Sequence, residues 1–360
     1  MSMITLVKAL GIIAIVAGHV GPVRLATLVY LYHIPLFFFV SGYLFTDKHS
    51  HAIWGLIKKR LMTLYFPYLI YCIIFLVLRD VFIRVGFYSQ NPQALIVMPT
   101  QASELTQGTL LKIFSFQYFE PLLWTFWFLP VLFFTAIFFA CIRRIALMTR
   151  YADSYTAIMV VILAIIGFLG AHLGIQTELR IDCSFVALIF FFAGFLFRKH
   201  ENAIPLKACW AIPAFIGMFA FGRHEPINML HRLFGNPVVY VSCALAGIYF
   251  NFWLAAQLAA HQGKAVGFLQ MIGRNTFSIL ALHLTSFKLV LYVRIMMGDA
   301  DMLKLVTIFP ATGFEMSFQW YVIYTAVGVL VPVVLAQALH IIKGRVFNVK
   351  DHLLEASSSK

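Results

Sequence analysis

Long apolar runs, broken by short polar stretches, make up most of this 360-residue chain. Most runs approach the roughly 20 residues that an α-helix needs to cross the core of a bilayer. They do not alternate apolar and polar residues as the strands of an outer-membrane barrel do. The pattern predicts an all-α, polytopic membrane bundle of about ten transmembrane helices. The expected segments are 4–22, 27–45, 61–85, 122–142, 156–173, 183–198, 208–222, 237–260, 273–296 and 318–342, of which 183–198 and 208–222 are short.

Composition supports a membrane protein, because 62% of the residues are hydrophobic and only 11% are charged. A soluble protein is nearer half apolar. No convincing small-residue cleavage site follows the first run, so it is expected to remain as an uncleaved helix. We expect one transmembrane domain over 1–343 and a short polar tail over 344–360. The five cysteines are scattered singly without metal-ligand spacing, which predicts packing roles and no metal site.

Charge in the connections predicts the orientation of the bundle. One set (46–60, 142–155, 198–207, 261–272 with Arg274, and the tail from 343) holds 16 Lys and Arg but 5 Asp and Glu. The other set (20–27, 79–121, 172–182, 222–236 and 294–317) holds 9 of each. The positive-inside rule places the first set and both termini in the cytoplasm, as expected for a multi-pass protein of the inner membrane. The net charge of +13 is therefore mainly a topology signal and does not indicate a nucleic-acid partner.

Two polar residues stand out in the first apolar run. Eleven residues separate Lys8 from His19, so both side chains share one helical face, roughly 16 Å apart. Charged groups in membrane helices usually face a bundle interior or a cavity, although Lys8 could also snorkel and His19 mark the interface. His33 lies at similar depth on the next helix, where Ser41 begins a small-residue pair suited to close packing or to a pocket wall. Two histidines at one depth favour a polar site, and histidine suits proton transfer near neutral pH.

Other polar and aromatic positions are weaker candidates for the acceptor site or its pocket. Trp124 and Trp127 share a helical face and predict either a pocket wall or an interfacial anchor. Arg180 and Asp182 precede the sixth helix and are either sugar ligands or part of a solvated loop. His283, with Lys288 beyond it, lies well inside the ninth helix, where ionisable groups are costly unless they face a cavity. The connection 79–121 is the longest and either covers the acceptor site or is a surface excursion.

Several motifs, in order, resemble the acyltransferase 3 family of integral membrane acyltransferases, most closely the polysaccharide O-acetylases of the fucose 4-O-acetylase type. The resemblance begins with the basic-x10-His pattern from Lys8 to His19 and with HIPLFFFVSGYLF. It continues with KKRLMTLYFPY and LLWTFWFLPVLF. It ends with LRIDCSFVALIFFFAGFLF and IGRNTFSILALH, and spans nearly the whole chain.

The resemblance implies an enzyme that moves an acyl group, usually acetyl, from cytoplasmic acyl-CoA to a hydroxyl of a surface polysaccharide or lipid-linked glycan. His19 is then the catalytic histidine and Lys8 its basic partner. The histidine either takes the hydroxyl proton directly or is acylated first and passes the group on. Acetyl-CoA is expected as a donor substrate, with no permanently bound cofactor. The family often has an acidic residue three positions before the base, where this chain has Thr5.

The donor site should be basic, because CoA carries phosphates. The resemblance points to Lys58, Lys59 and Arg60, which otherwise are a positive-inside anchor. The family commonly shows an R-x-x-R element near this point, which this chain lacks, although lysines also bind phosphate as point charges.

A polytopic transporter, flippase or glycan polymerase is the alternative class. Many transporters show an internal repeat with broken helices in matching halves. No such duplication is visible here, and the ordered motifs favour the acyltransferase.

Overall fold

The computed structural model of the chain describes residues 3–20, 23–88, 107–117, 120–224, 227–261, 263–300 and 316–358. Nearly all of this described part is helical. The helices are α1 (Met3–Val20), α2 (Val23–Tyr30), α3 (His33–Tyr43), α4 (Asp47–His51), α5 (Ile53–Arg60), α6 (Phe66–Arg84), α7 (Gln107–Phe114), α8 (Phe128–Ala146), α9 (Ala152–His172), α10 (Ile181–Lys199), α11 (Ala208–Gly222), α12 (Pro237–Ala260), α13 (Lys264–Arg274), α14 (Thr276–Met296) and α15 (Phe318–Ser358). Two short strands, β1 (Ile227–Asn228) and β2 (Leu233–Phe234), pair antiparallel.

Nine helical stretches of the described residues are long and apolar enough to cross a membrane, which confirms an all-α polytopic membrane fold. The prediction was about ten, and the tenth expected segment, 208–222, forms the shorter apolar helix α11 of 15 residues. The segment expected over 183–198 belongs to a longer stretch of 22 residues, Glu178–Lys199. The remaining spans are Met3–Val20, Ala26–Tyr43, Ile53–Arg84, Pro121–Ala146, Ala152–His172, Pro237–Ala260, Thr276–Met296 and Phe318–Ile341. The side on which the termini lie stays a prediction.

The second apolar segment is two helices rather than one. α2 ends at Tyr30 and α3 begins at His33, with a turn between them. Pro35 explains the break, because it has no N–H to donate to a carbonyl four residues earlier and restricts the residue before it. The turn places His33 in the first turn of a helix.

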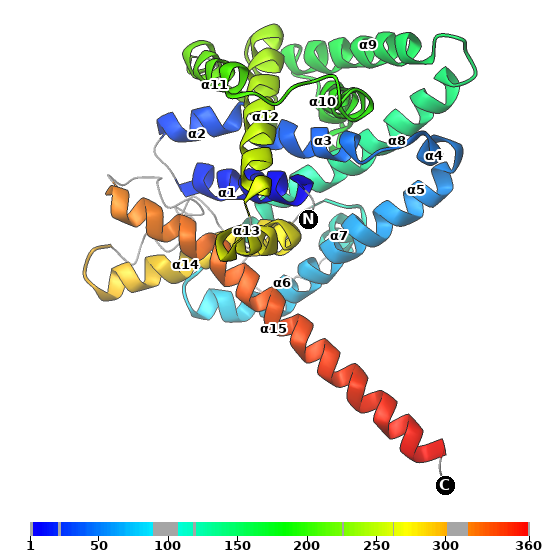
Figure 1. Ribbon diagram of the computed structural model, residues 1–360. Coiled ribbons are helices and arrows are strands. Elements are labelled where there is room, and N and C mark those ends of the chain that lie inside the picture. The colour runs from blue at the N-terminus through cyan, green and yellow to red at the C-terminus, as the bar shows by residue number, and fades with distance from the viewer. Residues whose placement is uncertain are drawn as a thin grey trace.

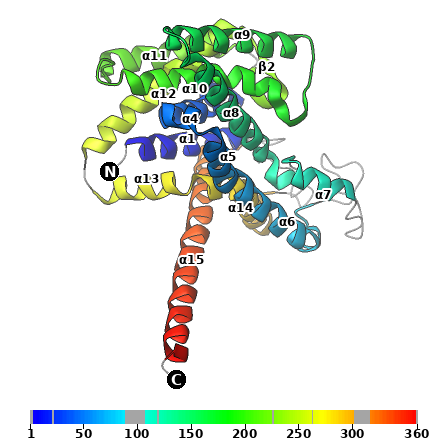
Figure 2. The ribbon, with the colours of Figure 1, turned by 90° about the vertical axis from the view of Figure 1, so that its right-hand side faces the viewer.

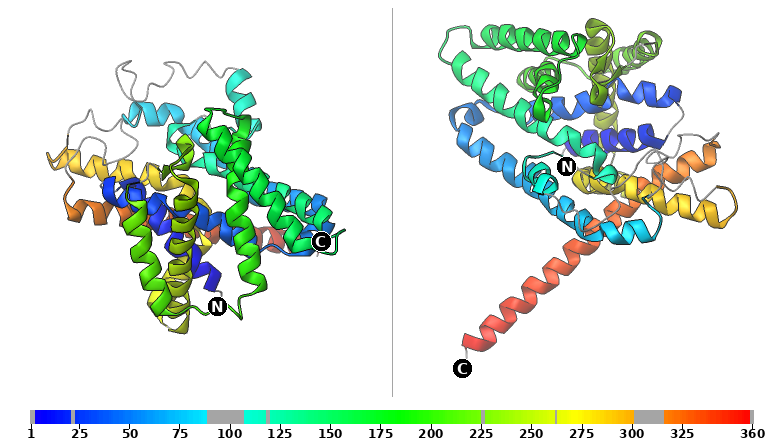
Figure 3. Two further views of the ribbon diagram at one scale, coloured as in Figure 1. Left: turned by 90° about the horizontal axis from the view of Figure 1, so that it is seen from above. Right: turned by 180° about the vertical axis from the view of Figure 1, so that it is seen from behind.

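The connection expected over 46–60 is largely helical, which corrects the sequence prediction. α4 and α5 fill most of it, and Lys58, Lys59 and Arg60 lie within one continuous helical stretch of 32 residues, Ile53–Arg84. A π-helical turn over Leu61–Tyr65 interrupts that stretch. Pro67 follows closely and removes one backbone donor, a common reason for such irregular turns. Figure 3 shows α5 and α6 as a long helix at the edge of the molecule.

The helix α3 packs on α10 at glycine contacts. A Cβ atom at Gly42 would lie 1.8 Å from the Phe191 carbonyl oxygen, and one at Gly194 would lie 2.0 Å from the Phe39 carbonyl oxygen. Only glycine permits this backbone approach, which is the way membrane helices pack when small residues line their interface.

The helix α1 runs through the middle of the molecule. It packs against α3 and α12 on one side and against α13, α14 and α15 on the other. Figure 1 shows it between α3 and α13, while the C-terminal part of α15 projects away from the bundle, as Figure 2 also shows. The tail expected over 344–360 is therefore helical as far as Ser358. Because α1 is enclosed, its polar residues Lys8 and His19 lie inside the protein.

Helices at the periphery expose apolar side chains that lipid would cover. Ile73 and Val77 on α6, and Ile165 and Leu169 on α9, are all more than half exposed. Apolar surface on this scale is typical of a membrane-facing exterior and unusual for a soluble monomer.

Candidate active site

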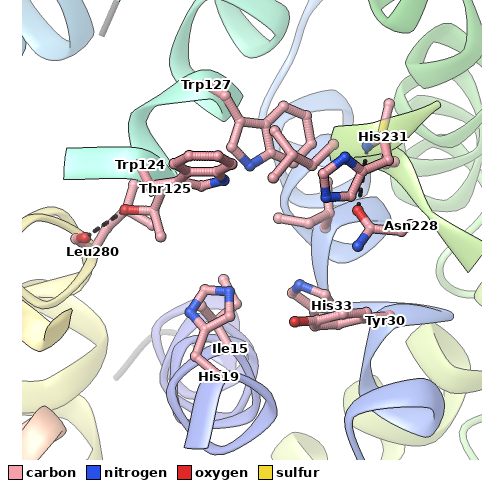
Figure 4. A pocket seen from close by; sticks show the side chains of 13 residues that line it. Ile15, His19, Tyr30, His33, Trp124, Thr125, Trp127, Asn228, His231 and Leu280 are labelled. Atoms are coloured by element: carbon pink, nitrogen blue, oxygen red, sulfur yellow. Dashed lines mark hydrogen bonds between the residues drawn. The ribbon is translucent and has the colours of Figure 1, made fainter. Parts of the chain in front are cut away.

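The His19 pocket is a cavity of about 100 Å³ at the end of α1. Its side chains come from α1, α2, α3, α14, the 3₁₀ helix Pro121–Trp127 and the β1–β2 hairpin. Figure 4 shows the imidazoles and indoles facing one another across it. The polar and aromatic members of its lining are His19, Tyr30, His33, Trp124, Thr125, Trp127, Asn228 and His231.

His19 and His283 form a hydrogen-bonded pair. The Nδ1 atom of His19 lies 2.9 Å from Nε2 of His283, and the two rings stack with centroids 5.1 Å apart. The Nδ1 atom of His283 lies 2.9 Å from the carbonyl oxygen of Ile279. A carbonyl only accepts, so Nδ1 of His283 carries its proton and its Nε2 accepts from His19 in the neutral pair. His19 therefore donates through Nδ1, and its Nε2 carries a lone pair.

His33 lies on the other wall of the same pocket. Its Nδ1 donates to the carbonyl oxygen of Val29 at 2.6 Å, which leaves the lone pair on Nε2. Tyr30 lies between the two histidines, with ring centroids 5.2 Å from His33 and 6.4 Å from His19. The predicted grouping of His19, His33 and His283 is thus reproduced in space.

The two tryptophans line the pocket from a 3₁₀ helix rather than from an α-helix. Residues three apart eclipse each other in a 3₁₀ helix, so Trp124 and Trp127 both reach the same cavity. Thr125 between them donates its hydroxyl to the Leu280 carbonyl oxygen at 2.9 Å. That bond ties the indoles to α14, the helix that carries His283.

The Lys8 cavity is a second and larger space, about 460 Å³, toward the start of α1. Five basic side chains line it, namely those of Lys8, His49, Lys59, Arg60 and Arg274. The other lining is mostly apolar and includes Phe37, Phe128 and Phe277. Positive charge at an apolar cavity suits a ligand that has a phosphorylated end and a nonpolar arm.

Two of the side chains expected at these sites lie elsewhere. Arg60 donates to the Ser41 hydroxyl at 2.6 Å, so Ser41 belongs to the Lys8 cavity and not to the acceptor pocket. Lys58 is exposed and does not line the cavity, whereas Lys59 and Arg60 of the same helix do. Among the residues that the structure describes, no ion pair involves Lys8.

The two cavities meet at Ile15 and Leu280, which line both. On α1 the lining residues are Lys8, Ile12, Ile15 and His19, at the three- and four-residue spacing of one helical face. A single helix face thus leads from a basic cavity to a histidine pocket, and two apolar side chains separate the two spaces.

Comparison with known proteins identifies the family. A family model for the acyltransferase 3 group, described as an acyltransferase domain, matches residues 2–337. The chain belongs to the acyltransferase 3 family. No curated protein and no solved structure matches this chain.

The acyltransferase 3 assignment makes this protein a multi-pass membrane acyltransferase and confirms the family resemblance seen in the sequence. The fucose 4-O-acetylase subtype stays a prediction, as do the donor, the acceptor and the roles of individual residues. Among the described residues no group of three or more His, Cys, Asp and Glu is placed to hold a metal ion.

In this acyltransferase, Arg180 and Asp182 have different surroundings. The Asp182 carboxylate is buried and paired with Arg232, with Nε 2.6 Å from Oδ2, and it also accepts from Thr177. These bonds occupy both carboxylate oxygens, and Asp182 lines neither the His19 pocket nor the cavity beside it. Arg180 lies over the Trp127 ring at 5.6 Å and lines a neighbouring cavity.

Sequence reasoning missed Tyr30, Asn228 and His231 as pocket residues. The sequence analysis used the connection 222–236 only to count charges for the orientation of the bundle. In the structure its β1–β2 hairpin places Asn228 and His231 at the pocket. Tyr30 immediately precedes the turn before His33, and its position three residues before that histidine was the one signal in the sequence.

Proposed function

We propose that this protein is an O-acyltransferase, most simply an O-acetyltransferase, that moves an acyl group from cytoplasmic acyl-CoA to a hydroxyl of a surface polysaccharide or lipid-linked glycan. The observation that carries the proposal is the His19–His283 pair beside a small pocket, joined along one face of α1 to a basic cavity. Donor and acceptor would enter from opposite ends and meet at His19.

His19 is the general base in this mechanism. Its Nε2 takes the proton of the acceptor hydroxyl, and the oxygen attacks the thioester carbonyl carbon. The C–S bond then breaks, and the proton on Nε2 passes to the departing CoA thiolate. His283 accepts from His19 Nδ1–H throughout, holds the required tautomer and stabilises the imidazolium, as the buried acid does in a Ser-His-Asp triad.

The Lys8 cavity is the proposed donor site. Lys59, Arg60 and Arg274 would contact the phosphates of CoA, and the apolar walls would hold the pantetheine arm. The thioester reaches His19 by passing Ile15 and Leu280, and Lys8 lies one turn before Ile12 on the same face. The glycan itself never needs to enter the basic cavity.

An acyl-histidine intermediate is the alternative route, in which Nε2 of His19 attacks the thioester carbonyl carbon and displaces the CoA thiolate. The acceptor hydroxyl then attacks the acyl carbon, the bond from that carbon to Nε2 breaks, and the hydroxyl proton passes through Nε2 to the thiolate. Acid quenching after mixing with radiolabelled acetyl-CoA, with no acceptor present, separates the two routes. Label bound to the protein, and absent from His19→Ala, indicates the two-step route. If no label is bound to the protein, but acetyl is still transferred when acceptor is added, the transfer is direct.

The proposed function is tested on the surface glycan of cells with and without this chain. Mass spectrometry and proton NMR should show one acetyl per repeat and an O-acetyl methyl signal, both lost in His19→Ala that still inserts into the membrane. Wild-type acetylation in a correctly inserted His19→Ala protein would overturn the mechanism. Unchanged glycan, together with no transfer from labelled acetyl-CoA, would favour a transporter.

A further inference from the structure

A third space, the Arg180 cavity, adjoins the His19 pocket. It measures about 380 Å³ and is lined mainly by polar side chains, among them Lys112, Gln117, Gln176, Glu178, Arg180 and Arg232. Trp127 lines both this cavity and the His19 pocket, so one indole separates the two. A ligand that reaches His19 and extends past Trp127 would enter the Arg180 cavity.

The backbone holds Arg180 in an unusual conformation at this boundary. Leu179 and Arg180 have φ of 55° and 56°, in the left-handed region that residues with a side chain seldom occupy. The guanidinium donates from Nη1 to the Leu230 carbonyl oxygen at 2.6 Å and lies 5.6 Å above the Trp127 ring. Strained residues of this kind cluster at ligand sites, where the surrounding structure maintains them.

Arg180 keeps donors that these contacts do not use. A guanidinium has five N–H donors in a planar fork, and the Leu230 carbonyl takes one of them. Leu230 also lines the His19 pocket, so the bond links the position of Arg180 to that pocket. The fork is the group best suited to bind a carboxylate with two parallel hydrogen bonds.

The charge of the Arg180 cavity favours an anion. Arg232 is neutralised by the buried Asp182 carboxylate. Glu178 is exposed and accepts from the Gln117 amide at 2.9 Å. Lys112 and Arg180 remain, so among the described lining residues and their ion-pair partners positive charge exceeds negative charge.

We propose that the acceptor is an acidic oligosaccharide, whose carboxylate-bearing sugar binds in the Arg180 cavity while the neighbouring sugar presents its hydroxyl to His19. This inference rests on the proposed O-acyltransferase function and specifies its acceptor. The His19 pocket, at about 100 Å³, receives only the reacting end of the glycan. Trp127 lies between the two sugars, and Arg180 binds the carboxylate.

The test compares surface glycan from the cell that carries this chain with the same glycan after chemical reduction of its carboxyl groups. Acetyl transfer is measured with the full-length protein in detergent, for wild type, Arg180→Gln and Arg180→Lys. Arg223→Gln is the matched control, because Arg223 is exposed, lies outside the three cavities and loses the same charge. Calorimetric binding of both glycans to His19→Ala gives a readout that needs no turnover.

Carboxyl reduction should raise the KM of wild type for glycan about tenfold or more, with kcat little changed. Arg180→Gln should raise the KM for native glycan by a similar factor. The KM of this variant should then be the same for native and carboxyl-reduced glycan. The KM of Arg180→Lys for native glycan should lie between those of wild type and Arg180→Gln. The KM of Arg223→Gln should equal that of wild type. The calorimetry should show native glycan binding more tightly than reduced glycan.

Equal KM values for native and reduced glycan would overturn the inference while leaving the O-acyltransferase function in place. The same holds if Arg180→Gln behaves as wild type, or if Arg223→Gln is impaired as severely as Arg180→Gln. A wild-type protein that transfers acetyl to neither glycan would instead remove the proposed function, and the inference with it.

Discussion

The Nδ1 atom of His19 lies 2.9 Å from Nε2 of His283, although 264 residues separate them along the chain. α1 and α14 pack side by side and bring the two imidazoles into a stacked pair. The Ile279 carbonyl oxygen then determines which nitrogen of each ring carries a proton. The proposed catalytic geometry therefore depends on two helices that are far apart in the sequence.

Replacing His283 should impair catalysis without affecting donor binding. We expect His283→Ala to lower kcat about 100- to 10,000-fold, because His19 loses the acceptor that sets its tautomer. His283→Gln should retain more activity, since its amide oxygen can accept from His19 Nδ1–H. Steady-state kinetics with labelled acetyl-CoA measures both. Wild-type kcat in a monodisperse His283→Ala protein would contradict the positioning role.

Lys8 should act through its charge in the donor cavity. Lys8→Ala and Lys8→Met should both raise the KM for acetyl-CoA about tenfold or more, the usual cost of a lost contact to a charged group. Lys8→Arg should stay near wild type. The methionine variant keeps the length of the side chain and isolates its charge. If Lys8→Ala transfers acetyl as wild type does, Lys8 is only an anchor at the membrane surface.

Ile15 and Leu280 should control passage between the two cavities. Ile15→Trp should reduce transfer at least about tenfold while acetyl-CoA still binds, because a larger side chain closes the contact between donor and histidine. Ile15→Val, which opens the contact, should remain active. Transfer and acetyl-CoA binding are measured on the same preparations. Leu280→Trp provides an independent variant, and normal turnover in both tryptophan variants would exclude this route.

Glu120 should make stability depend on pH. Burial raises the pKa of its carboxyl from 4.5 to about 7, and the Tyr88 hydroxyl and the Arg79 charge oppose that rise only in part. Between these pH values the folded state holds a proton that the unfolded state has lost. Stability should therefore fall as pH rises through this window, by at most about 1.4 kcal/mol per pH unit, and level off above it.

Thermal unfolding in detergent between pH 5 and pH 8 measures this effect. Glu120→Gln should remove the decline, while Glu178→Gln, which alters an exposed carboxyl, should retain it. A decline of equal slope in wild type and Glu120→Gln would assign the pH dependence to other groups.

Gly42 should tolerate no side chain. A Cβ atom there would overlap the Phe191 carbonyl oxygen, so Gly42→Ala should separate α3 from α10 and cost about 1–3 kcal/mol or more. Gly217→Ala on α11 is the matched control, because a Cβ there meets nothing within 4 Å. Thermal unfolding midpoints compare the two. Equal midpoints would mean that the α3–α10 contact relaxes without cost.

Much of this molecule was predictable from local sequence, because a membrane imposes simple rules. Every backbone polar group in a bilayer needs an internal partner, so each long apolar run is a helix. The eleven-residue spacing places Lys8 and His19 on one face, and the structure keeps them there. His33 was predicted to join His19 because the two lie at similar depth on consecutive helices, and His283 because an ionisable group inside a membrane helix is costly unless it faces a cavity.

Packing across distant helices decided the rest. The Ser41 hydroxyl accepts a hydrogen bond from Arg60, Lys58 is exposed, and the buried Asp182 carboxylate pairs with Arg232. The β1–β2 hairpin brought His231 to a pocket that no local pattern predicts. Helical periodicity determines which face of a helix is apolar, but it does not say which helix that face meets. The tautomers of the histidines and the division into three cavities depend on contacts between helices, so only the tertiary structure determined them.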